Sequence, residues 1–566
     1  MAKFSIAFFI FLQALLMGAQ TAPQFYWIQF SDKNNTPYSL ENPNGFLSEK
    51  AIWKRQIFSI PFDSLDLPVD PVYVAGVSNL LGAKLHHQSK WFNAVTVQVE
   101  DTLLEESLLA QWSALPYVIQ IKKLNEAKEE NSLVGKNEIP EERKFDSSDF
   151  SLTDEYAAFY GPSFQQVSMI NAHLLHEFGF TGEGIDVAVF DAGWNRADQL
   201  PIFDRLRERN AIVETRDFVF PGNSNVYNLS NHGTYVLSIM AGWMPDSLIG
   251  TAPDARYYLF RTENTFSEYI IEEDNWVAAA EYADSLGIDV INSSLGYSEF
   301  QDTLQNHTYA DMNGNTARSS IAADIAARKG ILVVNSAGNS GDDPWRYITA
   351  PSDGDSVLCV GAVNADEILA SFSSVGPSAD GDIKPNVVAM GALTIYADMD
   401  STVRAGNGTS FSSPVVAGAA ASLMQAVYGV KSNMEIFHAI ERSANHYLNP
   451  SDTVGYGVPD FWKALRMLKP EWSDDIDQKL INVYPNPAQN EIHVTTEWLL
   501  GNDIESYEIS DASGRIVDRR FTTLSQNLTT GLVSISWPTG QLTHGRYTLI
   551  LHTDKETRHA GFVVYY

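Results

Sequence analysis

The sequence predicts an α/β fold with a mainly parallel sheet covered by helices, over about residues 160–470. Three short, predominantly apolar segments in this region have the character of strands buried on both faces: 185–190, 287–292 and 330–335. Helical stretches such as 315–329 separate them. Strands that alternate with helices form parallel sheets, and such sheets bind ligands at the carboxyl ends of their strands.

We expect a small α+β module before this region and a small all-β sandwich after it. Residues 24–124 contain three strand-like segments and one stretch with leucines at helical spacing. Residues 475–566 show short alternating segments between turn residues, a pattern typical of an antiparallel β-sandwich. The segment 127–159 is charged and polar, which indicates a linker, and proteases cut most readily in such segments.

Residues 1–21 have the three-part pattern of a secretory signal peptide. Lys3 supplies a positive start, residues 4–18 are almost all apolar, and small residues follow. A membrane anchor is the alternative interpretation, but the apolar run is shorter than the roughly 20 residues that a membrane span needs. We therefore expect export with cleavage of this segment.

The overall charge limits the classes of partner. The 566 residues include 38 basic and 70 acidic side chains, which gives a net charge of −32. A charge this negative argues against nucleic acid or an anionic membrane as the main partner. Cys359 is the single cysteine, so the chain can form neither an internal disulfide nor a cysteine-rich zinc site.

Three polar residues at predicted strand and helix ends form the pattern of a nucleophilic site. Asp191 ends the strand 185–190, His232 begins a helix, and Ser410 opens another, in which we expect Pro414 to fall in the first turn. A serine hydroxyl is a poor nucleophile unless a histidine takes its proton, and an aspartate fixes the tautomer of that histidine. Each residue alone would be a turn, core or capping residue, but the order Asp, His, Ser is one known order of a catalytic triad.

Asn339 completes this pattern. It follows the strand 330–335, and its side-chain amide can donate a hydrogen bond to the oxyanion of a tetrahedral intermediate. The backbone N–H of Ser410, at the start of a helix, would be the second donor. Gly408 permits a substrate backbone to come close.

Together these motifs resemble those of the subtilase (subtilisin-like) serine peptidase family, in the family's order, over about residues 160–470. The matching segments are Asp191-Ala192-Gly193, His232-Gly233-Thr234, Ser294-Leu295-Gly296, Ser336-Ala337-Gly338-Asn339 and Gly408-Thr409-Ser410 with Pro414. The resemblance implies a serine endopeptidase that acts on proteins or peptides. It implies catalytic roles for Asp191, His232 and Ser410, an oxyanion role for Asn339, and binding of the substrate backbone as an added strand by Ser294, Leu295 and Gly296.

The resemblance also gives a meaning to the flanking regions. Residues 22–126 resemble the inhibitory prodomain of such proteases, which implies a zymogen cut within 127–159. Residues 475–566 look like a C-terminal sorting domain of type IX secretion, a system of gram-negative bacteria. The implied partners are therefore the chain's own prodomain and the secretion machinery. The implied location is extracellular or at the cell surface.

The implied reaction requires no cofactor, and structural calcium remains open because many subtilases bind it. The segment 311–315 lacks the oxygen spacing of an EF-hand and is better explained as an Asn-Gly turn. His86 and His87 are expected at the surface.

Two other classes of function fit the sequence less well than a peptidase does. A surface adhesin that keeps the fold without turnover would have no need of an intact Asp191, His232, Ser410 and Asn339. A carboxylate-pair glycosidase is indicated only by the 70 acidic residues, which are better explained as solvated surface.

Overall fold

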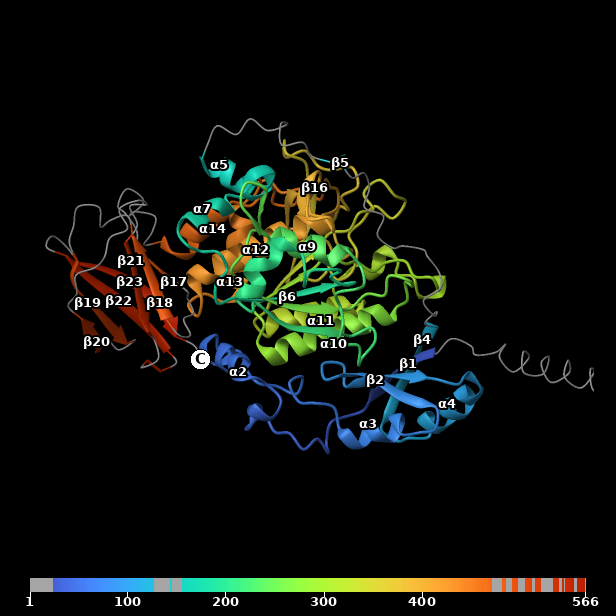
Figure 1. The fold of residues 1–566 in the computed structure, drawn as a ribbon. Coiled ribbons are helices and arrows are strands. Elements are labelled where there is room, and N and C mark those ends of the chain that lie inside the picture. Colours follow the sequence, from blue (N-terminus) through green and yellow to red (C-terminus); the bar gives the residue numbers. More distant parts are fainter. Residues whose placement is uncertain are drawn as a thin grey trace, which may run out of the picture.

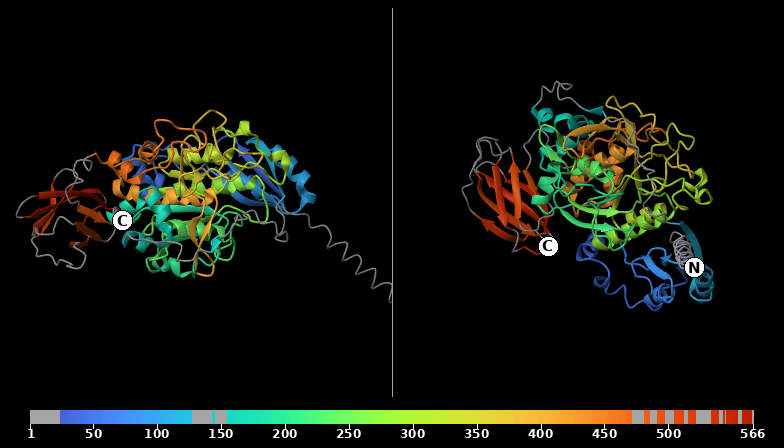
Figure 2. Two further views of the ribbon diagram at one scale, coloured as in Figure 1. Left: turned by 90° about the horizontal axis from the view of Figure 1, so that it is seen from above. Right: turned by 45° about the vertical axis from the view of Figure 1, so that its right-hand side comes forward.

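The computed structural model describes residues 24–126, 143–144 and 155–470, and, between 481 and 564, seven strands with a few residues beside them. The expected signal peptide, 1–21, and most of the linker, 127–159, lie outside the described residues. Figures 1 and 2 show the N-terminal module in blue and the C-terminal strands in red on different sides of the central domain.

The central domain is built on a seven-stranded sheet in which every described strand pair is parallel. The strands in spatial order are β14 (Val387–Met390), β13 (Val357–Val363), β12 (Leu332–Ser336), β11 (Val290–Ser293), β6 (Asp186–Asp191), β10 (Arg256–Arg261) and β7 (Ile212–Asp217). The predicted fold class is confirmed, and the three predicted strands correspond to β6, β11 and β12.

Helices cover both faces of this sheet because successive side chains of each strand point to opposite faces. In β6, Val187 and Val189 join one buried apolar cluster, whereas Ala188 and Phe190 join another. Helices α10 (Ile271–Leu286) and α11 (Arg318–Arg328) cover the second face. The first cluster draws on the remaining helices: α5 (Glu155–Tyr160), α6 (Phe164–Met169), α7 (Ala172–Glu177), α8 (Asp204–Glu208), α9 (His232–Ala241), α12 (Thr409–Val427), α13 (Asn433–Ser443) and α14 (Phe461–Leu468).

The N-terminal module has an antiparallel sheet in the order β2-β3-β1-β4. Its elements are β1 (Gln24–Phe30), α2 (Glu49–Ile57), α3 (Pro71–Ser78), β2 (Ala83–Ser89), β3 (Ala94–Val99), α4 (Glu105–Ser113) and β4 (Val118–Glu126). In Figure 1 the sheet of this module lies beside α10. Helix α2 is separate from the sheet and lies toward the opposite end of α10. The α+β character is as predicted, but the sequence pattern did not indicate β2, α2 or α3.

The remaining strands form small antiparallel sheets. Two of them make up the C-terminal domain: β17-β18-β21 (Ile481–Tyr484, Glu491–Thr496, Val533–Pro538) and β20-β19-β22-β23 (Ile516–Arg520, Ile504–Asp511, Gly545–Thr553, Thr557–Val564). In the central domain, β15 (Thr394–Ala397) pairs with β16 (Val403–Gly406), to which β5 (Arg143–Lys144) adds, and β8 (Trp243–Met244) pairs with β9 (Leu248–Ile249). Among the described residues, every helix is too short or too polar to cross a membrane.

Candidate active site

Asp191 is the last residue of β6, at the carboxyl edge of the sheet. Its side chain is fully buried, and both carboxylate oxygens lie 2.9 Å from Nδ1 of His232. The backbone N–H of Ala192 donates to the same carboxylate at 2.7 Å. The Asp191 carboxylate is therefore held in place and aimed at one nitrogen of His232.

His232 is the first residue of α9, and its ring is almost entirely buried. Burial alone would lower the pKa of His232, but the neighbouring Asp191 carboxylate outweighs it and raises the pKa above its ordinary value. Because Nδ1 faces the carboxylate, Nε2 remains as the proton acceptor. A base of this kind is what a serine nucleophile requires.

Two glycines allow the aspartate and histidine segments to approach one another. Gly193 has φ +144°, and a Cβ built there would lie 2.9 Å from the backbone nitrogen of Ser230. A Cβ on Gly233 would lie 2.4 Å from the carbonyl oxygen of Gly193. A side chain at either position would push His232 away from Asp191.

Ser410 is the second residue of α12 and lies beside the histidine. The ring of the next residue, Phe411, stacks with that of His232 at 6.4 Å between centroids. Among the described groups, the Ser410 hydroxyl donates to the carbonyl of Ser294 at 3.3 Å. The hydroxyl must therefore rotate before its proton can pass to His232. Catalytic hydrogen bonds are often long or poorly aligned in enzymes that have no substrate bound.

Pro414 corrects one expectation. It is the sixth residue of α12 rather than part of its first turn, so it deprives the carbonyl of Ser410 of its helical partner. The hydroxyl of Ser294 donates to that carbonyl at 3.0 Å and replaces the missing bond. Ser294 thus both donates to the Ser410 backbone and accepts from its side chain.

Asn339 lies at the carboxyl end of β12 with its amide oriented by Thr409. Its Oδ1 accepts from the backbone N–H of Thr409 at 2.8 Å and from the Thr409 hydroxyl at 2.9 Å. A Cβ built on Gly408, which has φ +153°, would lie 3.7 Å from both Asn339 Nδ2 and the Ser410 backbone nitrogen. The two predicted donors therefore converge on the space that Gly408 leaves open.

Ser294, Leu295 and Gly296 follow β11 next to the serine. Ser294 is buried, Leu295 is half-buried and Gly296 is exposed. The side-chain amide of Asn335 donates to the Leu295 carbonyl at 3.0 Å, which fixes this segment against β12. The structure thus brings the predicted binding segment to the nucleophile.

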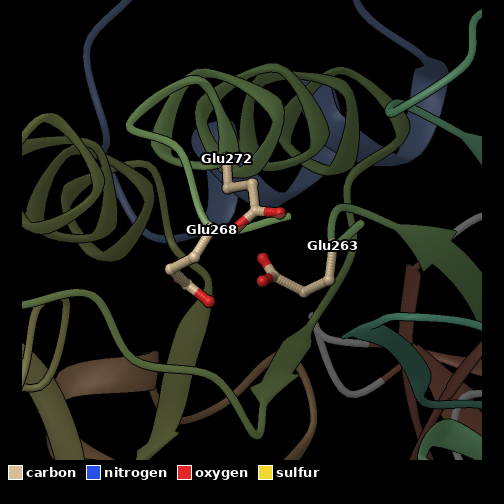
Figure 3. A group of neighbouring side chains, drawn as sticks. All are labelled: Glu263, Glu268 and Glu272. Carbon is tan, nitrogen blue, oxygen red and sulfur yellow. The ribbon is translucent and has the colours of Figure 1, made fainter. Parts of the chain in front are cut away.

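Three glutamates form a cluster near the site that the sequence did not predict. Glu263 follows β10, Glu268 lies in the loop after it, and Glu272 is in the first turn of α10; their carboxylates converge in Figure 3, with one oxygen of each within 4.8 Å of the others. Glu263 also contributes to the raised pKa of His232. The spacing of these residues carries no sequence signal, because a loop brings them together.

Within the part of the chain that the structure describes, this glutamate group is the cluster of side chains that could hold a cation, although protein groups already donate hydrogen bonds to two of its members. The Tyr297 hydroxyl donates to Glu263 at 2.5 Å, and the Asn264 backbone donates to Glu272 at 3.0 Å. The segment 311–315 does not fit a cation. There, Thr308 occupies the Asp311 carboxylate, and Asn313 accepts from the Asn315 backbone at 2.9 Å in a turn.

His86 and His87 are not at the free surface that the sequence indicated. Both are half-buried on β2, and His87 Nε2 lies 3.0 Å from Oδ1 of Asn275 on α10. Burial lowers the pKa of His87 to about 4. Surface exposure was the wrong expectation because the N-terminal module covers α10.

Three family profiles match the chain. The Subtilase family (peptidase S8) matches residues 182–457, the Peptidase S8 propeptide domain of Bacteroidota matches 25–137, and the Secretion system C-terminal sorting domain matches 482–565. These are the central domain, the N-terminal module and the C-terminal strands.

Several individual proteins are similar to about half of this chain. Subtilisin NAT of Bacillus subtilis subsp. natto is 31% identical over 296 residues, which are 52% of this chain and 68% of that protein. The Subtilisin-like protease SBT6.1 of Arabidopsis thaliana and the human Membrane-bound transcription factor site-1 protease are each 30% identical over 270 residues, which are 46% of this chain. This chain spans only 23% of the length of each of these two. The crystal structure of MycP1 with its N-terminal propeptide removed aligns with a TM-score of 0.41 at 24% identity, over 53% of this chain and 96% of that one.

Proposed function

Because the chain belongs to the subtilase family, we propose that it is a secreted serine endopeptidase, made as a zymogen, that hydrolyses peptide bonds of proteins. One observation carries the proposal. A buried carboxylate is aimed at His232, while Asn339 Nδ2 and the Ser410 backbone nitrogen converge over Gly408. A protein that only bound peptides would need neither the base nor the paired donors.

In the first half of the reaction, Ser410 attacks the carbonyl carbon of the scissile bond while His232 Nε2 takes the hydroxyl proton. The negative charge moves to the carbonyl oxygen, and Asn339 Nδ2 and the Ser410 N–H donate to it. Asp191 stabilises the imidazolium. His232 then gives its proton to the leaving amine, which departs and leaves an acyl ester on Ser410.

The second half repeats these roles with water. His232 takes a proton from a water molecule, which attacks the ester carbonyl, and the same two donors stabilise the new oxyanion. When the intermediate collapses, His232 returns the proton to Ser410 Oγ and the peptide acid leaves. The triad and the oxyanion donors supply every group that the reaction needs, so the proposal requires no cofactor. Calcium would act on stability alone, and Glu263, Glu268 and Glu272 are where a structural ion would be sought first.

We place the substrate backbone along Ser294, Leu295 and Gly296. The exposure of Gly296 and the position of Ser294 beside the nucleophile support this assignment. A peptide added there as a strand would gain main-chain hydrogen bonds regardless of its side chains. Such binding suits an enzyme whose substrates are proteins or peptides of varied sequence.

The flanking regions complete the zymogen. We propose a signal peptide at 1–21, an inhibitory prodomain at 22–126, a processing linker at 127–159, the peptidase at 160–470 and a sorting domain at 475–566. The propeptide and sorting-domain matches support the second and last assignments. The prodomain would be the intramolecular inhibitor, and the sorting domain would engage type IX secretion machinery and deliver the enzyme outside the cell or to its surface.

Labelling by a fluorophosphonate probe tests the activity directly. Such probes react only with a serine that a base has activated. The processed wild-type protein is expected to be labelled and Ser410→Ala is not. A wild-type protein that stays unlabelled after its prodomain has been cut and the cleft is open would refute the proposal and favour a binding protein on a peptidase fold.

A further inference from the structure

Helix α2 of the prodomain lies against the C-terminal end of α10. Just before α2, the backbone N–H of Ser48 donates to the carbonyl of Ser285, and its hydroxyl donates to the carbonyl of Leu286, both at 2.8 Å. Lys54 Nζ donates to the carbonyl of Ile288 at 2.6 Å. The last carbonyls of a helix have no partner within it, so the prodomain supplies donors that α10 and the following loop lack.

Two lysines of α2 also neutralise carboxylates at the edge where the strands of the central sheet begin. Lys50 contacts both Asp186, the first residue of β6, and Asp289, just before β11. Lys54 Nζ lies 3.2 Å from Oδ1 of Asp289. All four side chains are at least nine-tenths buried. Removing one partner of such a pair is strongly destabilising, because the other charge is left buried and alone.

A second ionic group crosses the same boundary. Arg55 bridges Asp66 of the prodomain and Asp284 of α10, and Lys90 Nζ lies 2.7 Å from the other oxygen of Asp284. In the opposite direction, Lys329 of the central domain lies 3.0 Å from Asp66. Each domain therefore holds buried charges whose partners belong to the other.

Close packing accompanies these charges. A Cβ on Gly287, which has φ +79°, would lie 2.6 Å from the backbone nitrogen of Ala51, so α2 rests directly on the glycine that ends α10. Trp53 stacks on Tyr428 with 5.4 Å between ring centroids. The contact thus combines buried ion pairs, helix capping and apolar packing.

The contact is far from the catalytic residues. Asp186 is the first residue of β6 and Asp191 is the last, so about 17 Å of strand, at about 3.3 Å per residue, separates the carboxylate held by Lys50 from the one held by His232. A segment bound at the first edge leaves the second edge free. Its continued presence is compatible with catalysis.

We propose that residues 46–66, the anchor, keep the prodomain bound to the peptidase after the linker has been cut, as a non-covalent subunit of the active enzyme. This inference rests on the proposed zymogen and gives the prodomain a second role. The anchor stays bound at one edge of the central sheet while the catalytic cleft opens at the other edge. Release of the prodomain then requires the buried ion pairs to break, and not only the cleavage of the chain.

Mass loss from a biosensor surface tests the anchor. The full chain carries Ser410→Ala, a site for a sequence-specific protease in the linker and a C-terminal tag that fixes it to the surface, and it is cut in place under flow. The wild-type anchor is expected to retain the prodomain fragment. Lys50→Ala is expected to speed its loss by at least about 100-fold. Lys84→Ala is the matched control, because Lys84 is exposed and its ion pair among the described residues is with Glu100 of its own domain, at 3.9 Å.

Two results would overturn the anchor. The wild-type fragment would leave as soon as the linker is cut, or Lys50→Ala and Lys84→Ala would lose it at the same rate. If Lys50→Ala does not fold, Ala51→Leu is read in the same way: Ala51 is buried where the α2 backbone meets Gly287, so a larger side chain there should displace α2 without removing a charge. Because Ser410→Ala removes turnover and binding alone is measured, failure here is distinct from failure of the proposed peptidase activity.

Discussion

Replacement of Asn339 by alanine tests the oxyanion site most directly. The substitution removes one of the two donors that converge over Gly408 and leaves the Ser410 N–H in place. Loss of one such donor costs about 10²–10³ in kcat, or about 2.7–4 kcal/mol of transition-state stabilisation. The ground-state carbonyl lies farther from the donor than the oxyanion does, so KM should change little.

Two further variants separate the donor from its support. Asn339→Asp keeps the oxygen that Thr409 orients but replaces the donor by a negative charge, so kcat should fall further than in Asn339→Ala. Thr409→Val removes one of the two hydrogen bonds to Asn339 Oδ1 and keeps the backbone bond of 2.8 Å. A net loss of about 1 kcal/mol, or about fivefold in kcat, is expected.

The assay is the steady-state hydrolysis of a fluorogenic peptide by the processed enzyme, with kcat and KM fitted separately. Active-site titration with a fluorophosphonate corrects each preparation for its fraction of folded enzyme. If Asn339→Ala keeps kcat within about threefold of the wild type, or if the loss lies in KM, the amide does not stabilise the transition state and the assignment is wrong.

Three other predictions follow from the charges and the domain order. The rise of kcat/KM on the acid side of the pH profile should lie above the pKa of an ordinary histidine, because Asp191 raises the pKa of His232 and only the neutral ring acts as base. In the same pH profile, Asp191→Asn should move this rise to lower pH and reduce kcat by about 10⁴. The affinity of the prodomain should fall as the pH falls from about 6.5 to 4. Burial lowers the pKa of His87 to about 4 and holds the pKa of His86 well below its usual range, so the bound form refuses protons that the free form accepts. Replacement of both histidines by asparagine should flatten this dependence in the biosensor assay. Deletion of 475–566 should leave peptide hydrolysis intact and stop delivery outside the cell, measured by fractionation; unaltered delivery would contradict the sorting role.

The catalytic arrangement was readable from the sequence because each of its residues ends or begins an element with a clear pattern. The apolar segment 185–190 identifies β6, and the residue after it must then lie at the carboxyl edge. The small residues after His232 and Ser410 identify buried helices that point their first turns at the same edge. Parallel topology brings these ends together, so the order of the motifs along the chain predicted that these residues meet at one edge of the sheet. Their catalytic roles stay a prediction.

The glutamate group and the contacts between the prodomain and the central domain could not be predicted from the sequence. Their members belong to loops and helix ends whose relative placement depends on packing between distant segments. Nothing near Lys50 in the sequence identifies Asp186, 136 residues later, as its partner. A lysine on a helix is usually solvated, and only the structure shows that α2 buries it.

Strand β6 begins with one buried carboxylate, Asp186, and ends with another, Asp191. The partner of Asp191 belongs to the central domain, whereas Asp186 also has a partner in the prodomain. Asp191 faces a histidine that belongs to the same folded domain, so its environment survives any cut in the linker. Asp186 keeps Arg256 of β10 at 2.7 Å but shares Lys50 with Asp289, which has no cation of the central domain beside it among the described ion pairs. Loss of the prodomain would thus place two neighbouring acids on one arginine. The buried acids at the edge of Asp186 therefore favour retention of the anchor. The pair of Asp191 and His232 at the catalytic edge does not depend on the anchor.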